Sequence, residues 1–412
     1  MRVLVISAAF PPMRAGEADH AFHLCRSLAD RGLDIHVLTT KKNVVTGSFP
    51  FRVYPLMRNW SWSDLPRLAR FVRRLAPEAV LLMYSDWIYN SHPMITFVPT
   101  LSRVLLSRVP VVTQFLIDHT SIDASLLTRT VLKAIAKCAG PRKIDYILGT
   151  LLHTSARVIV LSEHHRLRFA ENFPGVSSKI VVIPPPPLIS ICSDNNGAAR
   201  QRVRERLGVK ADDFVIAYFG YVDPTKGVDT LLKAFQIVAG LRRNVRLIMV
   251  GGGNGDGNAP LSKRSEAITR YEQAMYELPK QLGIADEVTW TGGYKSDSEE
   301  ASMYFRAADA CVLAFDKGIT LNRSSFAAAA AHGLPIITTK GTVVESPFVD
   351  QKNVLLCPPK DPKALAVAID LLIGNPELQQ RLGTGALELA HEWFSWDKAV
   401  ERTIEAFNST GS

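Results

Sequence analysis

Short apolar runs alternate with amphipathic stretches along the chain. The first apolar run, Arg2 to Ala9, precedes a stretch from Gly16 to Arg31 in which apolar residues recur three and four positions apart, and a second apolar run follows from Asp34 to Thr40. Short apolar runs predict buried strands, whereas spacings of three and four predict a helix with one buried face. Strands that alternate with helices form parallel, doubly wound sheets, so an α/β protein is predicted.

This alternation occurs twice. A boundary is predicted where four prolines, Pro184 to Pro187, precede the polar stretch ISICSDNNGAARQ, which is typical of a hinge linker. Two doubly wound domains joined by a hinge are expected to face a cleft that binds the substrate. The remaining predicted strands of the first half are Phe51 to Leu56, Ala79 to Ser85, Pro110 to Leu116, Ala156 to Ser162 and Lys179 to Ile183; those of the second half are Phe214 to Tyr218, Val245 to Val250, Glu287 to Thr291, Ala310 to Phe315, Pro335 to Thr339 and Asn353 to Cys357.

An unusually bare helix is predicted in the second half, within GITLNRSSFAAAAAHGLPIITT. Five alanines, Ala327 to Ala331, favour a helix that packs closely, and Ser324 or Ser325 is the expected N-cap. The preceding loop lies at the carboxyl edge of the sheet, where ligands bind in such folds. Helix N–H groups, the positive end of the dipole and Arg323 together predict an anion site for diphosphate. An ordinary cap beside a solvated arginine is the alternative.

Two further strand-to-helix turns carry phosphate-binding signals. In PPMRAGEADH, Gly16 would let the backbone approach a phosphate, and in FGYVDPTKGVDTLLKAF, Lys226 opens a helix at a turn facing the cleft. A solvated turn lysine is the alternative for Lys226. The sequence GGGNGDG, from Gly251 to Gly257, lacks the spacing of a dinucleotide fingerprint and predicts only a flexible loop.

The positive charge is concentrated in the first half. Of the formal charge of +9, the first 190 residues contribute 23 Lys and Arg against 12 Asp and Glu (+11), and the remainder 25 against 27 (−2). Arg67, Arg70 and Arg74 share one helical face within Leu65 to Glu78, and a second basic stretch runs from Thr128 to Lys143. Such helices can rest on anionic lipid. Solvated surface is the alternative, and the absence of aromatic platforms and of recognised modules argues against nucleic acid.

Cysteine usage and the apolar segments indicate the compartment. Five scattered cysteines without metal-ligand spacing predict reduced thiols, mostly buried: Cys25, Cys138, Cys192, Cys311 and Cys357. The apolar start MRVLVISAAF is followed by PPMRAG rather than a cleavage site, so a strand is expected there, and no apolar run reaches the length of a membrane span. We expect a cytoplasmic protein, either free or held at the inner face of the plasma membrane.

Several stretches, taken in order, resemble the GT-B glycosyltransferases of glycosyltransferase family 4. They are PP…AG before a helix, FGY…PTKGVDTLLKAF, TGGYKSDSEEASMYFRAADACVLAF, AAHGLPIITT and the final FSWDKAVERTIEAF. The resemblance implies two Rossmann-like domains: residues 1–190 on the acceptor side, with 394–412 packing back on them, and residues 191–393 binding a nucleotide-sugar donor. It also implies transfer with retention of configuration and without a metal, so that protein cations and helix dipoles must stabilise the departing diphosphate.

The resemblance assigns roles to individual residues. Lys226 matches the family's diphosphate lysine, and Gly16 matches the second glycine of its N-terminal loop, while Ala15 replaces the first. Gly293 and Tyr294 match the turn that usually receives the base, and Gly220 and Tyr221 are expected beside the nucleoside. The donor diphosphate site is therefore predicted to contain Gly16, Lys226, Arg323, Ser324 and Ser325.

The chain also departs from the family pattern. Two glutamates eight residues apart usually contact the donor sugar and the ribose, but Thr320 and Ala328 occupy those positions. Tyr221 stands where the family has a diphosphate arginine. We expect Arg323 to supply the lost cation, with Asn322 or the serines bonding ribose or phosphate.

Candidate catalytic residues are His119, Asp118 and Asp316. The family often has a histidine after the strand VPVVTQFL; the ungapped match is Phe115, and Asp118 and His119 lie slightly farther on. His119 could orient the reacting sugar or the acceptor, although an ordinary loop histidine is the alternative. Asp316 is the carboxylate expected to reach the sugar hydroxyls.

A retaining, metal-independent hexosyltransferase is thus predicted. Its expected donor is a nucleotide diphosphate sugar, with UDP as the expected nucleotide. Its expected acceptor is a glycan or a lipid-linked molecule in polysaccharide synthesis. One alternative is a relative that binds nucleotide sugar without turnover, for which the missing glutamates argue. Another is a sugar-phosphate epimerase or NAD-linked enzyme, against which the broken dinucleotide fingerprint argues.

Overall fold

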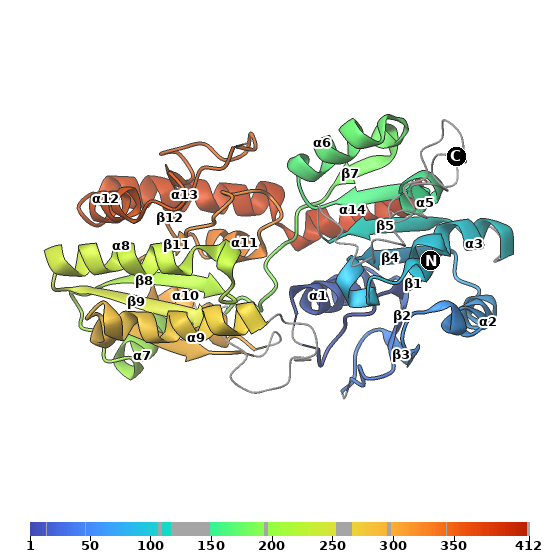
Figure 1. Cartoon of the computed structure of the whole chain (residues 1–412), viewed down its shortest axis with the longest axis horizontal. Coiled ribbons are helices and arrows are strands. Elements are labelled where there is room, and N and C mark those ends of the chain that lie inside the picture. Colours follow the sequence, from blue (N-terminus) through green and yellow to red (C-terminus); the bar gives the residue numbers. More distant parts are fainter. Residues whose placement is uncertain are drawn as a thin grey trace. The chain divides into compact units, whose positions relative to one another are not determined.

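The computed structural model describes most of the chain: residues 1–13, 15–45, 47–105, 109–116, 149–192, 197–252, 266–294, 298–342 and 344–409. Its contacts divide the chain into two compact units. Unit 1 comprises Met1–Pro184 with Trp396–Ser412, and unit 2 comprises Pro185–Ser395. Both are α/β units with a parallel sheet, which confirms the predicted fold class (Figure 1).

Unit 1 contains a seven-stranded parallel sheet in the order β3-β2-β1-β4-β5-β6-β7. Every strand was predicted from its apolar run, and most bounds differ by one to three residues because the runs extend into the turns. The strands are β1 (Arg2–Ile6), β2 (Asp34–Thr40), β3 (Arg52–Met57), β4 (Ala79–Tyr84), β5 (Val111–Phe115), β6 (Arg157–Val160) and β7 (Ile180–Val182).

The helices of unit 1 lie in two layers, one on each face of the sheet. Right-handed crossovers place the helix after β1 on one face and the helices after β3 to β6 on the other, because the strand order reverses between β1 and β4. One core joins the sheet to α1 (Gly16–Asp30) and α14 (Trp396–Asn408), and the other joins it to the remaining helices. These are α2 (Leu65–Leu75), α3 (Val98–Leu105), α5 (Gly149–Thr154) and α6 (Glu163–Asn172).

The last helix belongs to unit 1, as the fold class predicts. Its first residue, Trp396, lies against the rings of His20 and His23 on α1, at centroid distances of 6.2 and 5.9 Å. Phe394 lies instead in the core of unit 2, where its ring is 5.7 Å from that of Phe326. The returning segment therefore begins at Trp396 rather than at residue 394.

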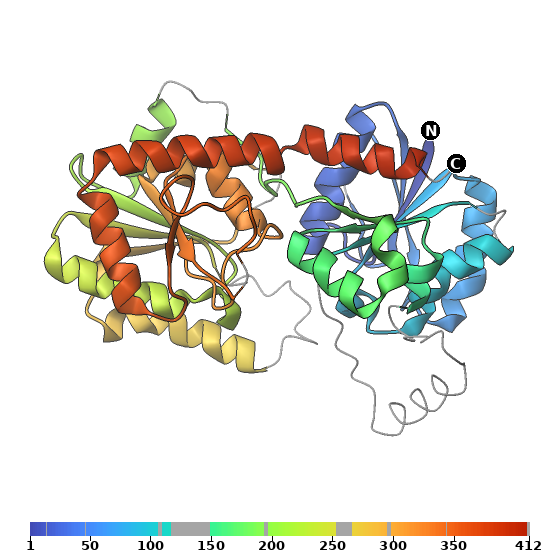
Figure 2. The same cartoon turned by 90° about the horizontal axis from the view of Figure 1, so that it is seen from above.

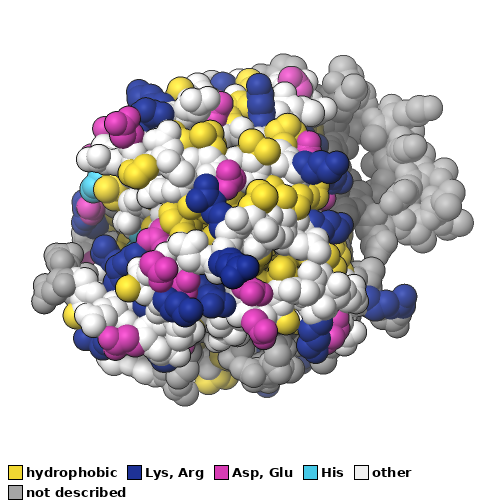
Figure 3. Space-filling view, turned by 90° about the vertical axis from the view of Figure 1, so that its left-hand side faces the viewer, with side chains coloured by type: hydrophobic (Ala, Val, Ile, Leu, Met, Phe, Trp, Pro, Cys, Tyr) yellow, Lys and Arg dark blue, Asp and Glu magenta, His cyan; other side chains and the backbone are white. Residues whose placement is uncertain are grey.

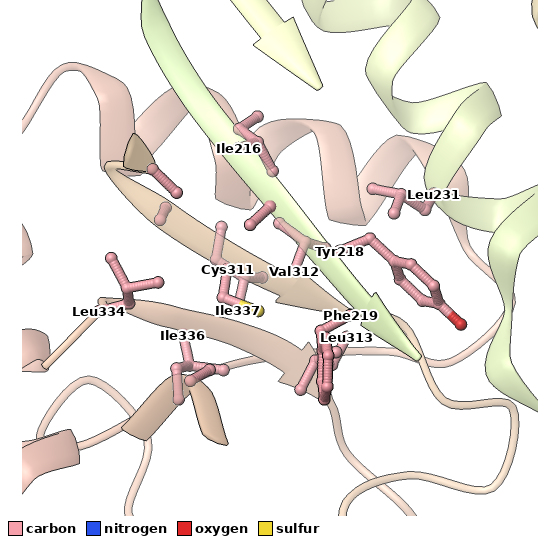
Figure 4. Close-up of a cluster of buried hydrophobic side chains, with 14 of the residues drawn as sticks. Ile216, Tyr218, Phe219, Leu231, Cys311, Val312, Leu313, Leu334, Ile336 and Ile337 are labelled. Carbon is pink, nitrogen blue, oxygen red and sulfur yellow. The ribbon is translucent and has the colours of Figure 1, made fainter. Parts of the chain in front are cut away.

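Unit 2 contains a six-stranded parallel sheet in the order β10-β9-β8-β11-β12-β13. Figure 4 shows how apolar side chains from β8, β11 and β12 fill one continuous core. The strands are β8 (Phe214–Gly220), β9 (Val245–Gly251), β10 (Val288–Gly292), β11 (Ala310–Leu313), β12 (Ile336–Thr339) and β13 (Leu355–Cys357).

Helices cover both faces of the unit 2 sheet (Figure 2). On one face α8 packs against α9 and α12, and on the other α7 packs against α10 and α11 packs against α13. The strand order reverses between β8 and β11, so the helices that follow these two strands leave on opposite faces. The helices are α7 (Ala198–Arg206), α8 (Val228–Leu241), α9 (Glu266–Gln281), α10 (Glu300–Ala307), α11 (Ser324–Ala331), α12 (Pro362–Ile373) and α13 (Pro376–Trp393).

The alanine helix packs as closely as its composition predicts. Ala327 to Ala330 are fully buried in α11, between the sheet and α13. A Cβ on Gly383 of α13 would lie 2.6 Å from the Gly333 carbonyl oxygen, so only glycine permits this approach. The bare helix is therefore explained by packing on both of its sides.

The predicted linker packs on folded structure in its described parts, and residues 193–196 lie outside the described residues. Pro184 to Pro187 are buried, and the Cys192 amide donates to Ser302 Oγ at 2.8 Å. The end of the polar stretch, from Ala198, forms the start of α7. The linker prediction is wrong for those residues, because the arginine-rich segment gains a packing partner in α10.

Candidate functional site

The loops that follow β8 and β11 meet at the point where the strand order of unit 2 reverses. In open α/β sheets this point is a natural binding crevice, because the two loops diverge toward opposite faces. The β8 loop ends in the short 3-10 turn η5 (Pro224–Lys226), and the β11 loop leads into α11. Lys226 and Arg323, which were predicted separately, belong to these two loops.

The two loops are joined by their backbones. The Asp316 amide donates to the Thr225 carbonyl oxygen at 3.1 Å. Gly227 adopts the left-handed conformation, with φ of 64°, and a Cβ built on it would lie 1.8 Å from the Ala314 carbonyl oxygen. Glycine is therefore required both for the backbone conformation and for the close approach. The contact fixes the start of α8 against the β11 loop.

Lys226 and Arg323 share one aromatic ring. The Lys226 Nζ lies 5.3 Å, and the Arg323 Cζ 4.6 Å, from the centre of the Phe315 ring. Both are cation–π distances, and Phe315 is buried. The ring thus holds a lysine and an arginine from different loops close together. The strand prediction had included Phe315, but β11 ends at Leu313 and Phe315 lies in the loop.

Protonation of Lys226 is less favourable in this cation pair than in water. Burial and, secondarily, the neighbouring Arg323 guanidinium lower the pKa of Lys226 to about 8, while Asp223 opposes the shift. Among the described carboxylates, none forms an ion pair with Lys226. A bound anion would relieve the repulsion between the two cations, so the pair is suited to a phosphate group.

Helix α11 begins without a side-chain cap. Arg323 is the N-cap residue and makes no capping bond through its side chain, so the prediction of a serine N-cap is wrong. Ser324 and Ser325 instead form the first turn, and the first backbone bond of the helix runs from the Ala327 amide to the Arg323 carbonyl oxygen. The first amides of α11 therefore have no partner within the helix and add to the positive potential beside Arg323.

Asp316 follows Phe315 directly and forms an ion pair with Lys360, at 3.2 Å. Lys360 lies beyond β13, at the same edge of the sheet. The carboxylate is thus engaged, although the exposed Lys360 side chain leaves the pair open to exchange of partners. The catalytic role of Asp316 stays a prediction.

The expected nucleoside residues lie at the carboxyl ends of β8 and β10. Gly220 ends β8 with φ of 136°, and its carbonyl oxygen accepts from the Gly252 amide at 3.0 Å. Tyr221 is exposed, and its carbonyl oxygen accepts from the Tyr218 hydroxyl at 2.8 Å. Gly293 is exposed, and Tyr294 stacks on Phe219 at a centroid distance of 5.5 Å. These residues share one edge with the cation pair, but their role as a nucleoside site stays a prediction.

The two positions that lack the family's glutamates differ in environment. Thr320 is half-buried in the β11 loop, and its hydroxyl donates to Asn322 Oδ1 at 2.6 Å. Ala328 is fully buried in α11. A glutamate at Ala328 would therefore have to displace packed core side chains.

In unit 1, the corresponding reversal of strand order lies between β1 and β4. Gly16 begins α1 there, and a Cβ built on it would meet nothing within 4 Å, so close approach of a ligand is open. Glu17 accepts from Trp87 Nε1 at 2.8 Å, and burial raises the pKa of the Glu17 carboxyl. Sequence reasoning missed this acid–indole pair, because only the fold brings α1 and the end of β4 together.

Unit 1 also contains a buried histidine near this edge. His20 Nε2 lies 3.0 Å from Gln114 Nε2, and burial lowers the pKa of His20 to about 4. Its imidazole is therefore neutral at physiological pH. Asp118 and His119, together with the basic stretch from Thr128 to Lys143, lie outside the described residues.

Charge and thiols follow the sequence expectations in part. On the face of unit 2 drawn in Figure 3, basic and acidic side chains are interspersed. The four cysteines within the described ranges, Cys25, Cys192, Cys311 and Cys357, are buried free thiols, as predicted. None of the helices in the described part of the chain is both long and apolar enough to cross a bilayer. Within that same part, no three His, Cys, Asp or Glu side chains are grouped to hold a metal ion.

Comparison with protein families identifies the class of the chain. The model described as "Glycosyl transferases group 1" matches residues 199–388, and that described as "Glycosyltransferase Family 4" matches residues 15–186. The first model covers the whole sheet of unit 2, and the second covers the sheet of unit 1 apart from β1. The two models together cover most of the chain, which therefore belongs to the glycosyltransferase family of the group 1 and family 4 type, and its two parallel α/β units have the GT-B fold.

Two curated relatives share about a quarter of their aligned residues with this chain. The chain is 25% identical over 287 residues to a D-inositol 3-phosphate glycosyltransferase of Thermomonospora curvata, an alignment that covers 66% of this chain and 62% of the relative. It is 28% identical over 236 residues to the enzyme of the same name from Corynebacterium glutamicum, covering 56% and 51%. The chain thus spans less than two thirds of the length of these relatives.

Solved structures share the fold over nearly the whole chain. HepE of Anabaena, solved in complex with UDP and glucose, has a TM-score of 0.70 at 16% identity, covering 99% of this chain and 100% of that one. WaaG, a glycosyltransferase involved in lipopolysaccharide biosynthesis, has a TM-score of 0.65 at 15% identity, with 100% of each chain covered.

Proposed function

We propose that this glycosyltransferase moves a hexose from a nucleotide diphosphate sugar, with UDP as the preferred nucleotide, to a glycan or lipid-linked acceptor in polysaccharide synthesis. The observation that carries the donor part is the pairing of Lys226 and Arg323 on Phe315, beside the uncapped start of α11. Two cations and free helix amides suit a diphosphate better than a single phosphate or a carboxylate.

The relatives support the choice of nucleotide. HepE has been solved with UDP and with UDP-glucose. Its likeness to this chain is one of fold, so the base and the sugar rest on analogy.

The reaction would be a retaining transfer without a metal. The departing diphosphate would take up negative charge next to Lys226, Arg323 and the first amides of α11, which supply electrostatic stabilisation in place of a cation. Asp316 and His119 remain the proposed groups for orienting the sugar and the acceptor. A transfer of this kind would proceed unchanged in EDTA.

Attachment to an anionic membrane surface is proposed for the basic side of unit 1. Helix α2 presents the exposed side chains of Arg70, Arg73 and Arg74 and buries Leu68 and Val72 against the sheet. Arginines on the outer face of an amphipathic helix favour contact with anionic lipid headgroups. The protein would then act in the cytoplasm at the inner face of the plasma membrane.

Binding without turnover is the second candidate, because Thr320 and Ala328 replace the two family glutamates. Nucleotide release separates the candidates. A panel of UDP-, GDP- and ADP-sugars is incubated with the full chain, with and without crude lipid acceptor and with EDTA. Selective release from one donor, unchanged by EDTA, supports transfer or hydrolysis without a metal. Saturable binding without release under every condition would support the second candidate.

A further inference from the structure

A buried carboxylate lies behind the loop that carries Arg323. Glu345, in the segment between β12 and β13, is only 4% exposed, and its carboxylate accepts a hydrogen bond from the Leu321 amide. Burial of a carboxylate is unfavourable unless hydrogen bonds compensate it, so the Leu321 amide stabilises the buried Glu345 carboxylate. Sequence reasoning did not single out Glu345.

The segment around Glu345 also supports α11 directly. The Phe348 amide donates to the Glu345 carbonyl oxygen at 3.0 Å, which closes a turn. The Phe348 ring then meets that of Phe326, in the first turn of α11, edge to face at 5.2 Å. The turn therefore contacts both the loop before α11 and the start of the helix.

The loop is fixed at two backbone amides shortly before Arg323. The Ile319 amide donates to the Thr339 carbonyl oxygen at 2.9 Å, and the Leu321 amide donates to Glu345. The side chains of Ile319 and Leu321 are fully buried. With the backbone set at these points, Arg323 follows two residues later with its guanidinium over Phe315.

We propose that Glu345 is a positioning residue of the donor site, which holds the β11 loop so that Arg323 faces the diphosphate. The inference rests on the proposed donor-binding function of Arg323. The Leu321 amide that donates to Glu345 directly follows Thr320. Thr320 stands at one of the two positions where the family has a glutamate. It acts on the backbone of the loop, and the substrate contact is left to Arg323.

The test combines loop exchange with nucleotide binding in the full-length protein. Hydrogen exchange of peptides covering residues 316–326 is measured without nucleotide, and UDP affinity is measured by calorimetry. The variants are Glu345→Ala and Glu345→Gln, with Glu388→Gln, an exposed change in α13, as the matched control. We expect Glu345→Ala to speed exchange of the loop and to weaken UDP binding about tenfold, Glu345→Gln to restore part of both, and Glu388→Gln to change neither.

A double variant shows whether Glu345 acts through Arg323. In an Arg323→Ala background, Glu345→Ala should weaken UDP binding little further. Wild-type exchange and UDP affinity in Glu345→Ala would overturn the proposal, as would an equal loss of affinity in both backgrounds. If Glu345→Ala does not fold, Glu345→Gln gives the same exchange comparison. If the wild-type protein binds no nucleotide, the proposed function fails, while the exchange result still decides whether Glu345 orders the loop.

Discussion

The guanidinium of Arg323 lies over the ring of Phe315, with its Cζ 4.6 Å from the ring centre. Lys226, from the neighbouring loop, uses the same ring. One buried aromatic side chain thus holds two cations together at the carboxyl edge of unit 2. Both cations lie in loops, outside the strands. Under the proposed donor role, this shared ring lets a chain with Tyr221 in place of the family's arginine hold two cations at one site.

Arg323 and Lys226 should act as one unit toward UDP. Because a charged hydrogen bond contributes about 1.5–3 kcal/mol, Arg323→Ala and Lys226→Met should each weaken UDP binding by roughly 10- to 100-fold. The double variant should lose less than the sum, since the remaining cation already binds poorly once its partner is gone. Arg243→Ala, an exposed arginine at the opposite end of α8, removes a charge without touching the site and serves as the control. Additive losses would show that the two cations bind independently.

UDP affinity should depend on pH through Lys226. Its pKa of about 8 means that the side chain loses its proton as the pH rises from about 7 to 9, and the neutral amine attracts diphosphate weakly. The affinity should therefore fall across this range. Lys226→Arg keeps its charge, so its affinity should stay nearly constant. Calorimetry in two buffers of different ionisation enthalpy should also detect proton uptake on binding at pH about 8.5. Identical pH profiles for the wild type and Lys226→Arg would show that deprotonation of Lys226 does not cause the pH dependence of UDP binding.

Gly227→Ala should destabilise unit 2. The new Cβ would have to displace the Ala314 carbonyl, and the left-handed backbone adds strain, so a loss of about 2–4 kcal/mol in the free energy of unfolding is expected. Gly240→Ala is a matched control in the same helix, because a Cβ there meets nothing within 4 Å. That change should stabilise by about 0.5–1 kcal/mol, as alanine favours helix over glycine. Denaturant unfolding measures both, and equal effects would contradict the assigned contact.

Ionisation of Glu17 should lower the free energy of unfolding of unit 1 as the pH rises. Burial raises the pKa of its carboxyl in the folded state, so the unfolded chain loses the proton first, and stability falls between the unfolded pKa, about 4.3, and the higher folded one. Glu17→Gln, which can still accept from Trp87, should lack this loss. Its melting temperature should therefore rise relative to the wild type as the pH increases from about 4 to 8. Glu388→Gln serves as the control, and a constant difference for Glu17→Gln across the range would refute the effect.

Membrane attachment should depend on the basic face of α2. Replacing Arg70 and Arg74 with glutamate reverses two exposed charges without touching the buried Leu68 or Val72. Because each basic residue near an anionic surface contributes about 1 kcal/mol, sedimentation with vesicles of about 30% anionic lipid should fall more than tenfold. Neutral vesicles provide the baseline. Equal sedimentation of the wild type and the variant would place any membrane contact elsewhere.

The sequence predicts the secondary structure closely because both sheets are parallel and buried. Each strand is then a continuous apolar run, and the intervening helices are set by spacing, as in β2, whose bounds were predicted without error. The ends of elements are less well determined. Phe315 looks like the last residue of a strand, but the chain leaves the sheet at Leu313, and this departure converts a core aromatic into the ring that supports Arg323.

The site was predicted only where a residue type carries its own signal. A lysine before a helix, as at Lys226, or an arginine before an alanine run indicates an anion site from local sequence. Glu345 and Trp87 act across long sequence separations, on Leu321 and Glu17, and nothing near them in the sequence indicates those partners. The serine cap failed because Arg323 takes the N-cap position and Ser324 enters the helix.

Calorimetric titration of the full-length protein with UDP measures whether the Phe315 cation pair, Lys226 and Arg323, binds the diphosphate. The wild type and the Lys226→Met/Arg323→Ala double variant are compared, with melting curves to show that both are folded. The wild type should bind UDP saturably and uridine much more weakly, and the double variant should show no measurable UDP binding. Wild-type UDP affinity in a folded double variant would show that the diphosphate binds somewhere other than the Phe315 cation pair.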